Sequence, residues 1–294
     1  MSVTPKPAGG VGMDWMSMGI GILIMIAIIG AVYIWFPPAS GLMGFLDPSN
    51  IFMALIAIIV GGALIGIGVH FVPVGGAPAA MGQAPGIATG VAMLAGGAGL
   101  AGLFGGAWAA AIEPDPGIWV VCMAGAVGGA LMMAITCMFV NVIYVYAMGI
   151  PAASGKAKVD PITGDTQTEY KSQGTEGHGL PFISFVGGVV GGFLGGLGGT
   201  LIYYVLLEWV YVDRLLSDAL GAPAVANVTP IAVSLAGMFA IGLFLVNAVL
   251  AAYNITGTIE GPHDPKFARW PRAVVATAVA SAVCGIVAIG IVAV

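Results

Sequence analysis

The sequence is poor in charged residues, with only 8 Lys or Arg and 13 Asp or Glu among 294 residues. Soluble domains carry roughly 25% charged residues because their surface must be hydrated, whereas the share here is 7%. The net charge of -5 also excludes the basic surface that nucleic-acid binding requires. With 59% hydrophobic residues, the composition is that of a protein whose surface lies largely in lipid.

Cysteine is scarce as well: the sequence holds Cys122, Cys137 and Cys284, each inside an apolar run. A continuous helix would separate the first two by about 22 Å, which is far beyond the reach of a disulfide. We therefore expect neither a disulfide nor a metal cluster from the cysteines.

Long charge-free runs are what the sequence does contain. A helix needs about 20 apolar residues to cross about 30 Å of hydrocarbon. Cutting the runs at proline and glycine, notably across 71–86 and at Pro223 and Pro230, predicts seven spans. The predicted fold is thus all-α, a polytopic membrane helix bundle. Residues 1–46 form an N-terminal tail and an additional helix, and 47–294 form a six-helix membrane domain. The predicted spans are 16–36, 51–70, 88–112, 119–146, 182–207, 230–252 and 273–294.

The basic residues predict the orientation of the bundle. Seven of the eight fall on the side of the N-terminus, and only Arg214 falls on the other side. Cytoplasmic segments are enriched in Lys and Arg, so we expect a multi-pass protein of the cell membrane with a cytoplasmic N-terminus. The sizeable hydrophilic loops, 147–181 and 253–272, then face the cytoplasm, where soluble partners would dock.

Glycine is abundant, with 48 residues concentrated in the spans. In the fifth span Gly187, Gly191, Gly195 and Gly199 recur every four residues, a spacing that allows close helix packing in lipid. Spans two to four and five to seven each contain an odd number of crossings. A structural repeat between these triplets would therefore be inverted, and we expect such a 3+3 arrangement with the first span outside it.

Asp, Glu, Lys and Arg are missing from the middle of every span, although such residues commonly mark ion paths. The candidates for an ion path are neutral instead: Thr136, Asn141, Thr200 and Asn247. The two asparagines are favoured because an amide oxygen is a hard ligand suited to sodium. The alternative is that each side chain bonds a backbone carbonyl or a facing helix.

The three histidines are predicted at cytoplasmic ends of spans, two of them among acidic residues. These groups would form a polar vestibule or a partner contact, and ordinary interfacial loops are the alternative. Their spacing matches no zinc pattern, so no metal site is expected. The residues are His70, Glu176, His178, Glu260, His263 and Asp264.

Four runs of sequence resemble one known family. They are 69–81 (VHFVPVGGAPAAM), 159–164 (VDPITG), 174–181 (GTEGHGLP) and 257–267 (GTIEGPHDPKF). In this order they resemble the D subunit of the membrane-bound tetrahydromethanopterin S-methyltransferase complex of methanogenic archaea. The resemblance runs from about Asp47 to Val294, and residues 1–46 depart from the family pattern.

The resemblance implies an integral subunit of an assembly that moves a methyl group from methyl-tetrahydromethanopterin to coenzyme M and drives sodium out of the cell. It implies that a corrinoid sits on a partner subunit and that the other integral subunits and the corrinoid-carrying subunit are partners. No cofactor is expected on this chain itself, sodium is the ion that the complex moves, and no catalytic residue is assigned to this chain. Two alternatives remain open: a self-sufficient inverted-repeat secondary ion transporter, and a scaffold that never touches the ion.

Overall fold

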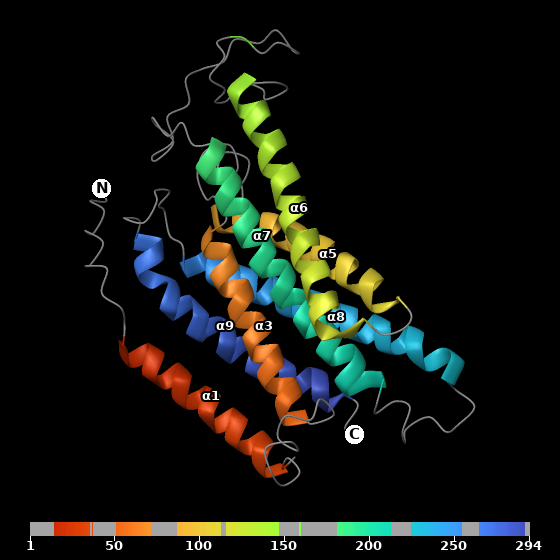
Figure 1. Cartoon of the computed structure of the whole chain (residues 1–294). Helices are drawn as coiled ribbons and strands as arrows, with labels where there is room; N and C mark the ends of the chain where they lie inside the picture. The colour runs from red at the N-terminus through yellow and green to blue at the C-terminus, as the bar shows by residue number, and fades with distance from the viewer. Residues whose placement is uncertain are drawn as a thin grey trace, which may run out of the picture.

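The computed structural model describes residues 15–35, 37, 51–71, 87–112, 116–146, 159, 181–212, 225–254 and 265–291. Long helices occupy nearly all of them (Figure 1). In chain order these are α1 (Trp15–Trp35), α3 (Ile51–Phe71), α5 (Ile87–Ala110), α6 (Gly117–Tyr146), α7 (Pro181–Tyr204), the π-helical segment η1 (Val205–Val212), α8 (Val225–Asn254) and α9 (Pro265–Gly290).

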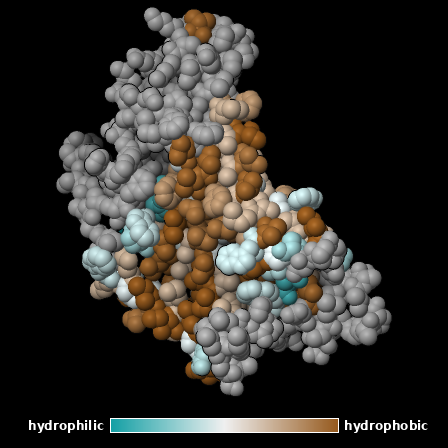
Figure 2. Space-filling model, in the orientation of Figure 1, coloured by the Kyte–Doolittle hydropathy of each residue, from teal (hydrophilic) through white to brown (hydrophobic). Residues whose placement is uncertain are grey.

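The predicted membrane bundle is confirmed. Within the described residues, six helical spans are long and apolar enough to cross a membrane, and Gly99–Ala110 of α5 is a shorter apolar helix. Hydrophobic residues cover most of the described surface on the face shown in Figure 2. Each predicted span corresponds to one helix, and the span predicted over 182–207 continues through η1 to Val212.

Two helices begin earlier than the proline positions predict. The expected spans start at 230 and 273, but α8 begins at Val225 and α9 at Pro265, so Pro230 and Pro271 lie inside helices. Proline removes one backbone N–H, but its fixed φ is close to the helical value. Membrane helices tolerate this loss where neighbouring groups satisfy the backbone. Separately, the Ser234 hydroxyl of α8 donates to the Pro230 carbonyl at 2.7 Å, one turn after the proline.

The helices α3 and α7 cross at the centre of the bundle, backbone against backbone. A Cβ added to Gly61 would lie 2.7 Å from the carbonyl oxygen of Gly198, and one added to Gly68 would lie 2.8 Å from that of Gly191. Because the earlier residue of α3 meets the later residue of α7, the two helices run antiparallel. Only glycine permits this approach at the crossing.

The predicted inverted repeat is visible in these contacts. Gly61 and Gly191 are 130 positions apart, as are Gly68 and Gly198, so exchanging the two helices reproduces both contacts. The neighbours follow the same exchange: α3 packs against α8 and α9, whereas α7 packs against α5 and α6. An axis that exchanges two antiparallel helices is perpendicular to them. In a membrane that axis lies in the plane, which is the inverted topology of many transporters.

The correspondence between the two halves of the repeat extends to α6 and α9. Gly62 and Gly66 of α3 face Ser281 and Thr277 of α9, and Gly192 and Gly196 of α7 face Gly129 and Gly125 of α6. Thr277 therefore corresponds to Gly125 and Ser281 to Gly129, an offset of 152 positions.

The helix α1 lies outside the repeat, as expected. It lies along α9 and touches the start of α3 (Figure 1). A Cβ added to Gly21 would be 3.0 Å from Val275 of α9, and the rings of Tyr33 and Phe52 meet edge to face with centroids 5.6 Å apart. The outer side of α1 is exposed and apolar.

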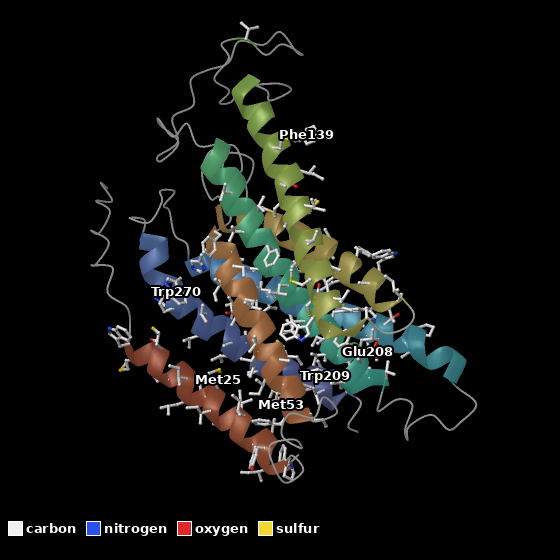
Figure 3. All side chains as sticks on the ribbon, in the orientation of Figure 1. Met25, Met53, Phe139, Glu208, Trp209 and Trp270 are labelled. Atoms are coloured by element: carbon white, nitrogen blue, oxygen red, sulfur yellow. The ribbon has the colours of Figure 1, made fainter. Side chains whose placement is uncertain are left out.

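The segment η1 carries aromatic residues near the end of a span. The position of Tyr211 near a span end predicts a ring at the membrane interface. The structure instead buries Tyr211 completely, and its hydroxyl donates to the Ala288 carbonyl of α9 at 2.9 Å. Trp209, labelled in Figure 3, is partly buried against the same core. Both residues belong to the π-helical segment η1.

Candidate functional site

Five polar side chains are buried among the described residues: His70, Thr200, Asn247, Thr277 and Ser281. Asn247, Thr277 and Ser281 gather where α3, α8 and α9 meet, and His70 follows on the same face of α3; we call these four the polar cluster. Each is at most 1% exposed. Buried polar groups need partners, so the bonds of the cluster decide what it can do.

Asn247 is the residue of the cluster that has an unpaired hydrogen-bond acceptor. Its Nδ2 group donates to Ser281 Oγ at 2.8 Å. Its Oδ1 atom is buried and has no hydrogen-bond partner. Leaving a buried acceptor unpaired costs about 1–3 kcal/mol, so an oxygen in this state is suited to a ligand or an ordered water.

Glycines of α3 make room for these side chains. A Cβ on Gly62 would overlap Ser281 Oγ and lie 2.7 Å from Asn247 Nδ2, and one on Gly66 would lie 2.6 Å from Thr277 Oγ1. Gly62, Gly66 and His70 follow one another at intervals of four residues and so share one face of α3. That face is turned toward the polar side chains of α8 and α9.

The remaining members bond to nearby backbone. Nδ1 of His70 lies 2.7 Å from the Gly66 carbonyl oxygen, and Thr277 Oγ1 donates to the Val274 carbonyl at 3.0 Å. These bonds hold the imidazole and the hydroxyl against α3 and α9. They leave the oxygens of Thr277 and Ser281 able to accept a further bond, because a hydroxyl oxygen has two lone pairs.

The polar cluster extends from mid-membrane toward one end of α3. Gly62 and Ser281 lie near the middle of their spans, Ile51–Phe71 and Trp270–Gly290. His70 is two helical turns farther along α3, about 12 Å at 1.5 Å per residue. In the other direction the interior is apolar, with Leu55 and Ile58 fully buried against Gly285.

The repeat shows that packing does not require this polarity. The positions of α6 that correspond to Thr277 and Ser281 are Gly125 and Gly129, and they pack equally closely on α7. Glycine thus suffices for the close approach of the outer helix in the first half. Hydroxyl groups at the same place in the second half therefore suggest a chemical role.

The other predicted ion-path residues lie elsewhere. Thr200 is buried on α7, where its hydroxyl donates to the Gly102 carbonyl of α5 at 3.2 Å. This is the bond to a backbone carbonyl that the alternative interpretation expects. Thr136 is partly buried on α6, which packs against α5 and α7. The side chain of Asn141 lies outside the described residues.

Of the residues predicted to form a vestibule, the structure describes only His70, and its side chain is buried. The positions of Glu176, His178, Glu260, His263 and Asp264 fall outside the described residues, so their roles stay predictions. Among the residues that are described, no three His, Cys, Asp or Glu side chains are grouped as a metal would need. The polar cluster offers neutral amide and hydroxyl oxygens, which hard cations accept.

Sequence reasoning missed Thr277 and Ser281. A usable signal was the spacing of small residues four apart in α9, Ala273, Thr277, Ser281 and Gly285, which is typical of helix contacts in membranes. It also missed the repeated motif of α3 and α7. The runs VGGALIGIG at 60–68 and VGGFLGGLG at 190–198 agree at six of nine positions.

Comparisons with known proteins give a consistent result. The family model MtrD, which describes the D subunit of tetrahydromethanopterin S-methyltransferase, matches residues 51–281. A protein of that name from Methanosarcina barkeri is 50% identical over 243 residues, which cover 81% of this chain and 93% of the relative. Those from Methanothermobacter marburgensis and Methanocaldococcus jannaschii are 52% and 42% identical, covering 78% and 83% of this chain and 91% and 98% of the relatives.

Proposed function

The chain belongs to the family formed by the D subunit of tetrahydromethanopterin S-methyltransferase, and from this premise we propose that it carries part of a sodium path in that complex. The complex would move a methyl group from methyl-tetrahydromethanopterin to coenzyme M through a corrinoid and would export sodium. In this proposal the corrinoid and the pterin are bound by partner subunits. This chain contributes no catalytic residue.

The observation that carries the proposal is the unpartnered Oδ1 of Asn247 at the inner end of the polar cluster. A sodium ion needs several oxygen ligands and accepts neutral ones. Asn247 Oδ1, Ser281 Oγ and Thr277 Oγ1 are neutral oxygens on two facing helices. Described spans bring no Asp, Glu, Lys or Arg to this place, so a charged ligand would come from another integral subunit.

The proposed direction follows from the orientation predicted by the basic residues. The His70 end of α3 would face the cytoplasm of a cell membrane in which the N-terminus is cytoplasmic. Sodium would enter the polar cluster from that side. Methylation of the corrinoid would change the docking of its subunit on loops 147–181 and 253–272 and so alternate access to the ion.

Replacing Asn247 tests the proposal. In the complex reconstituted into proteoliposomes, Asn247→Ala should raise the sodium concentration for half-maximal methyl transfer about tenfold. One lost ligand or hydrogen bond is worth about 1.4 kcal/mol, within the 1–3 kcal/mol of a buried acceptor. The measurements are sodium-22 transport and coenzyme M methylation on the same vesicles.

Ser234→Ala is the matched control. Ser234 is on the same helix, but it is exposed and bonds only the Pro230 carbonyl of α8, so sodium dependence should not change. If Asn247→Ala assembles normally and keeps wild-type sodium dependence, Asn247 is not on the sodium path and the proposal fails; normal transport after loss of every neutral polar group in the spans would identify a scaffold. Sodium transport by this chain alone would instead identify a self-sufficient secondary transporter.

A further inference from the structure

One face of α6 is exposed along most of its length. Residues at intervals of four form a continuous stripe on a helix, and on α6 this stripe is apolar and exposed, with Trp119 81% exposed. The opposite face of α6 packs on α5 and α7. We call the stripe the α6 ridge, formed by Trp119, Met123, Val127, Leu131 and Ile135.

The inverted repeat relates the α6 ridge to an occupied surface. The offset of 152 positions between α6 and α9 places Met123 and Val127 in correspondence with Val275 and Val279. These two valines are the α9 residues nearest to Gly21 of α1, at 3.0 and 3.7 Å from a Cβ built on that glycine. The centre of the exposed ridge is therefore the counterpart of the surface on which α1 lies.

The two halves of the repeat differ in what covers this surface. In the second half α1 covers it, and Met25, Ile28 and Ile29 of α1 also pack against the core there (Figure 3 labels Met25). In the first half the ridge is exposed, and Figure 3 shows Phe139, farther along α6, on the side away from α7. No helix in the described part of the chain takes the place of α1 on α6.

We infer that the α6 ridge docks one transmembrane helix of another chain of the complex, seated on α6 as α1 is seated on α9. The docked helix is apolar and uncharged and has glycine or alanine where it crosses Met123 and Val127, as α1 has Gly21 at Val275 and Val279. Such small residues let membrane helices approach closely.

The composition of the surface fits a protein partner. Two methionines, Met132 and Met138, are exposed beside the ridge, and Met123 lies within it. Methionine is common at adaptable helix-binding surfaces because its side chain is flexible and polarizable. The inference rests on membership of a multisubunit complex and does not depend on the sodium path, so the two stand or fall separately.

Site-specific photo-crosslinking in the intact complex tests the inference. The photoreactive residue p-benzoylphenylalanine replaces Val127 in one variant and Met238 in the control. Met238 is an exposed residue of α8, 62% accessible, which the repeat does not relate to a docked helix. We expect irradiation to shift most of the Val127 variant to a higher mass, with peptides of one different membrane chain in the adduct. The Met238 variant should give no protein adduct.

A second variant tests the same contact without crosslinking. Val127→Trp places a large ring where the docked helix crosses, so the purified complex should lose that chain while the other subunits remain. Met238→Trp should retain it. Lipid adducts alone at position 127, an adduct to a second copy of this chain, or full retention in Val127→Trp would each overturn the inference.

Discussion

At the scale of single residues, Gly62 and Asn247 depend on each other. The amide and the Ser281 hydroxyl occupy the space that a side chain at Gly62 would fill. The buried acceptor of Asn247 therefore persists because α3 has no Cβ at this point. In a close-packed interior, small changes in volume are costly, so the site is sensitive to a single methyl group.

Gly62→Ala tests this dependence. The new methyl group would overlap Ser281 Oγ, and overpacking of this kind costs about 1–3 kcal/mol. We expect a lower thermal midpoint for the purified complex and a higher sodium concentration for half-maximal methyl transfer. Gly242→Ala is the control, because a Cβ there meets nothing within 4 Å. A midpoint for Gly62→Ala equal to that of the control would show that the local packing is looser than described.

The residue scale is also where prediction from sequence is weakest. Asn247 is predicted from its polarity within an apolar run, and it is buried in the polar cluster. Thr200 is predicted by the same reasoning, yet its hydroxyl bonds the Gly102 carbonyl. Polarity identifies a side chain that needs a partner, but it does not reveal whether a backbone carbonyl of another helix lies within reach.

At the scale of elements, η1 connects the end of the α7 span to α9. The Tyr211 hydroxyl bonds the Ala288 carbonyl across 77 positions of sequence. This bond fixes the far ends of the two helical segments against each other. π-Helical turns are rare and are found frequently at functional sites.

Removing that bond should destabilise the assembly modestly. Tyr211→Phe keeps the ring and removes the hydroxyl, so we expect a loss of about 1 kcal/mol, the usual net value of one buried hydrogen bond. The measurement is the thermal midpoint of the complex in detergent. Tyr33→Phe, at a half-exposed ring of α1, serves as the comparison. A larger effect at Tyr33 than at Tyr211 would contradict the assignment.

Helices are the best predicted feature, because a charge-free run long enough to cross a bilayer has few alternatives. The errors lie at the ends, where Pro230 and Pro271 are expected outside or at the boundary of a span but lie within helices. Proline marks a missing N–H, and membrane helices accommodate one. The sequence rule therefore places the boundary of a span several residues too late.

At the scale of the whole molecule, the inverted repeat orders the six helices from α3 to α9. The odd number of spans in each triplet predicts the inversion, but the pairing of α3 with α7 requires the glycine contacts. The sequence signal for that pairing is the motif shared by 60–68 and 190–198, which holds the contacting glycines. It is inconspicuous because glycine and aliphatic residues are common throughout this chain.

The orientation of the bundle can be tested by cysteine labelling. In a variant without native cysteines, Val159→Cys and Ile112→Cys place thiols at two exposed positions. The positive-inside rule predicts that a membrane-impermeant maleimide labels position 159 only in inverted vesicles and position 112 only in right-side-out vesicles. The reverse pattern would show that the bundle has the opposite orientation, with the His70 end of α3 toward the outer surface.

The apolar packing of Leu55 and Ile58 against Gly285, beyond the inner end of the polar cluster, has an energetic consequence. A bare cation in such a hydrophobic constriction loses its hydration and gains no oxygen ligands, so the barrier to its passage is high. In the proposed sodium path, this apolar layer closes the polar cluster at its inner end. If sodium follows that path, the layer limits its leakage back down the gradient through this subunit.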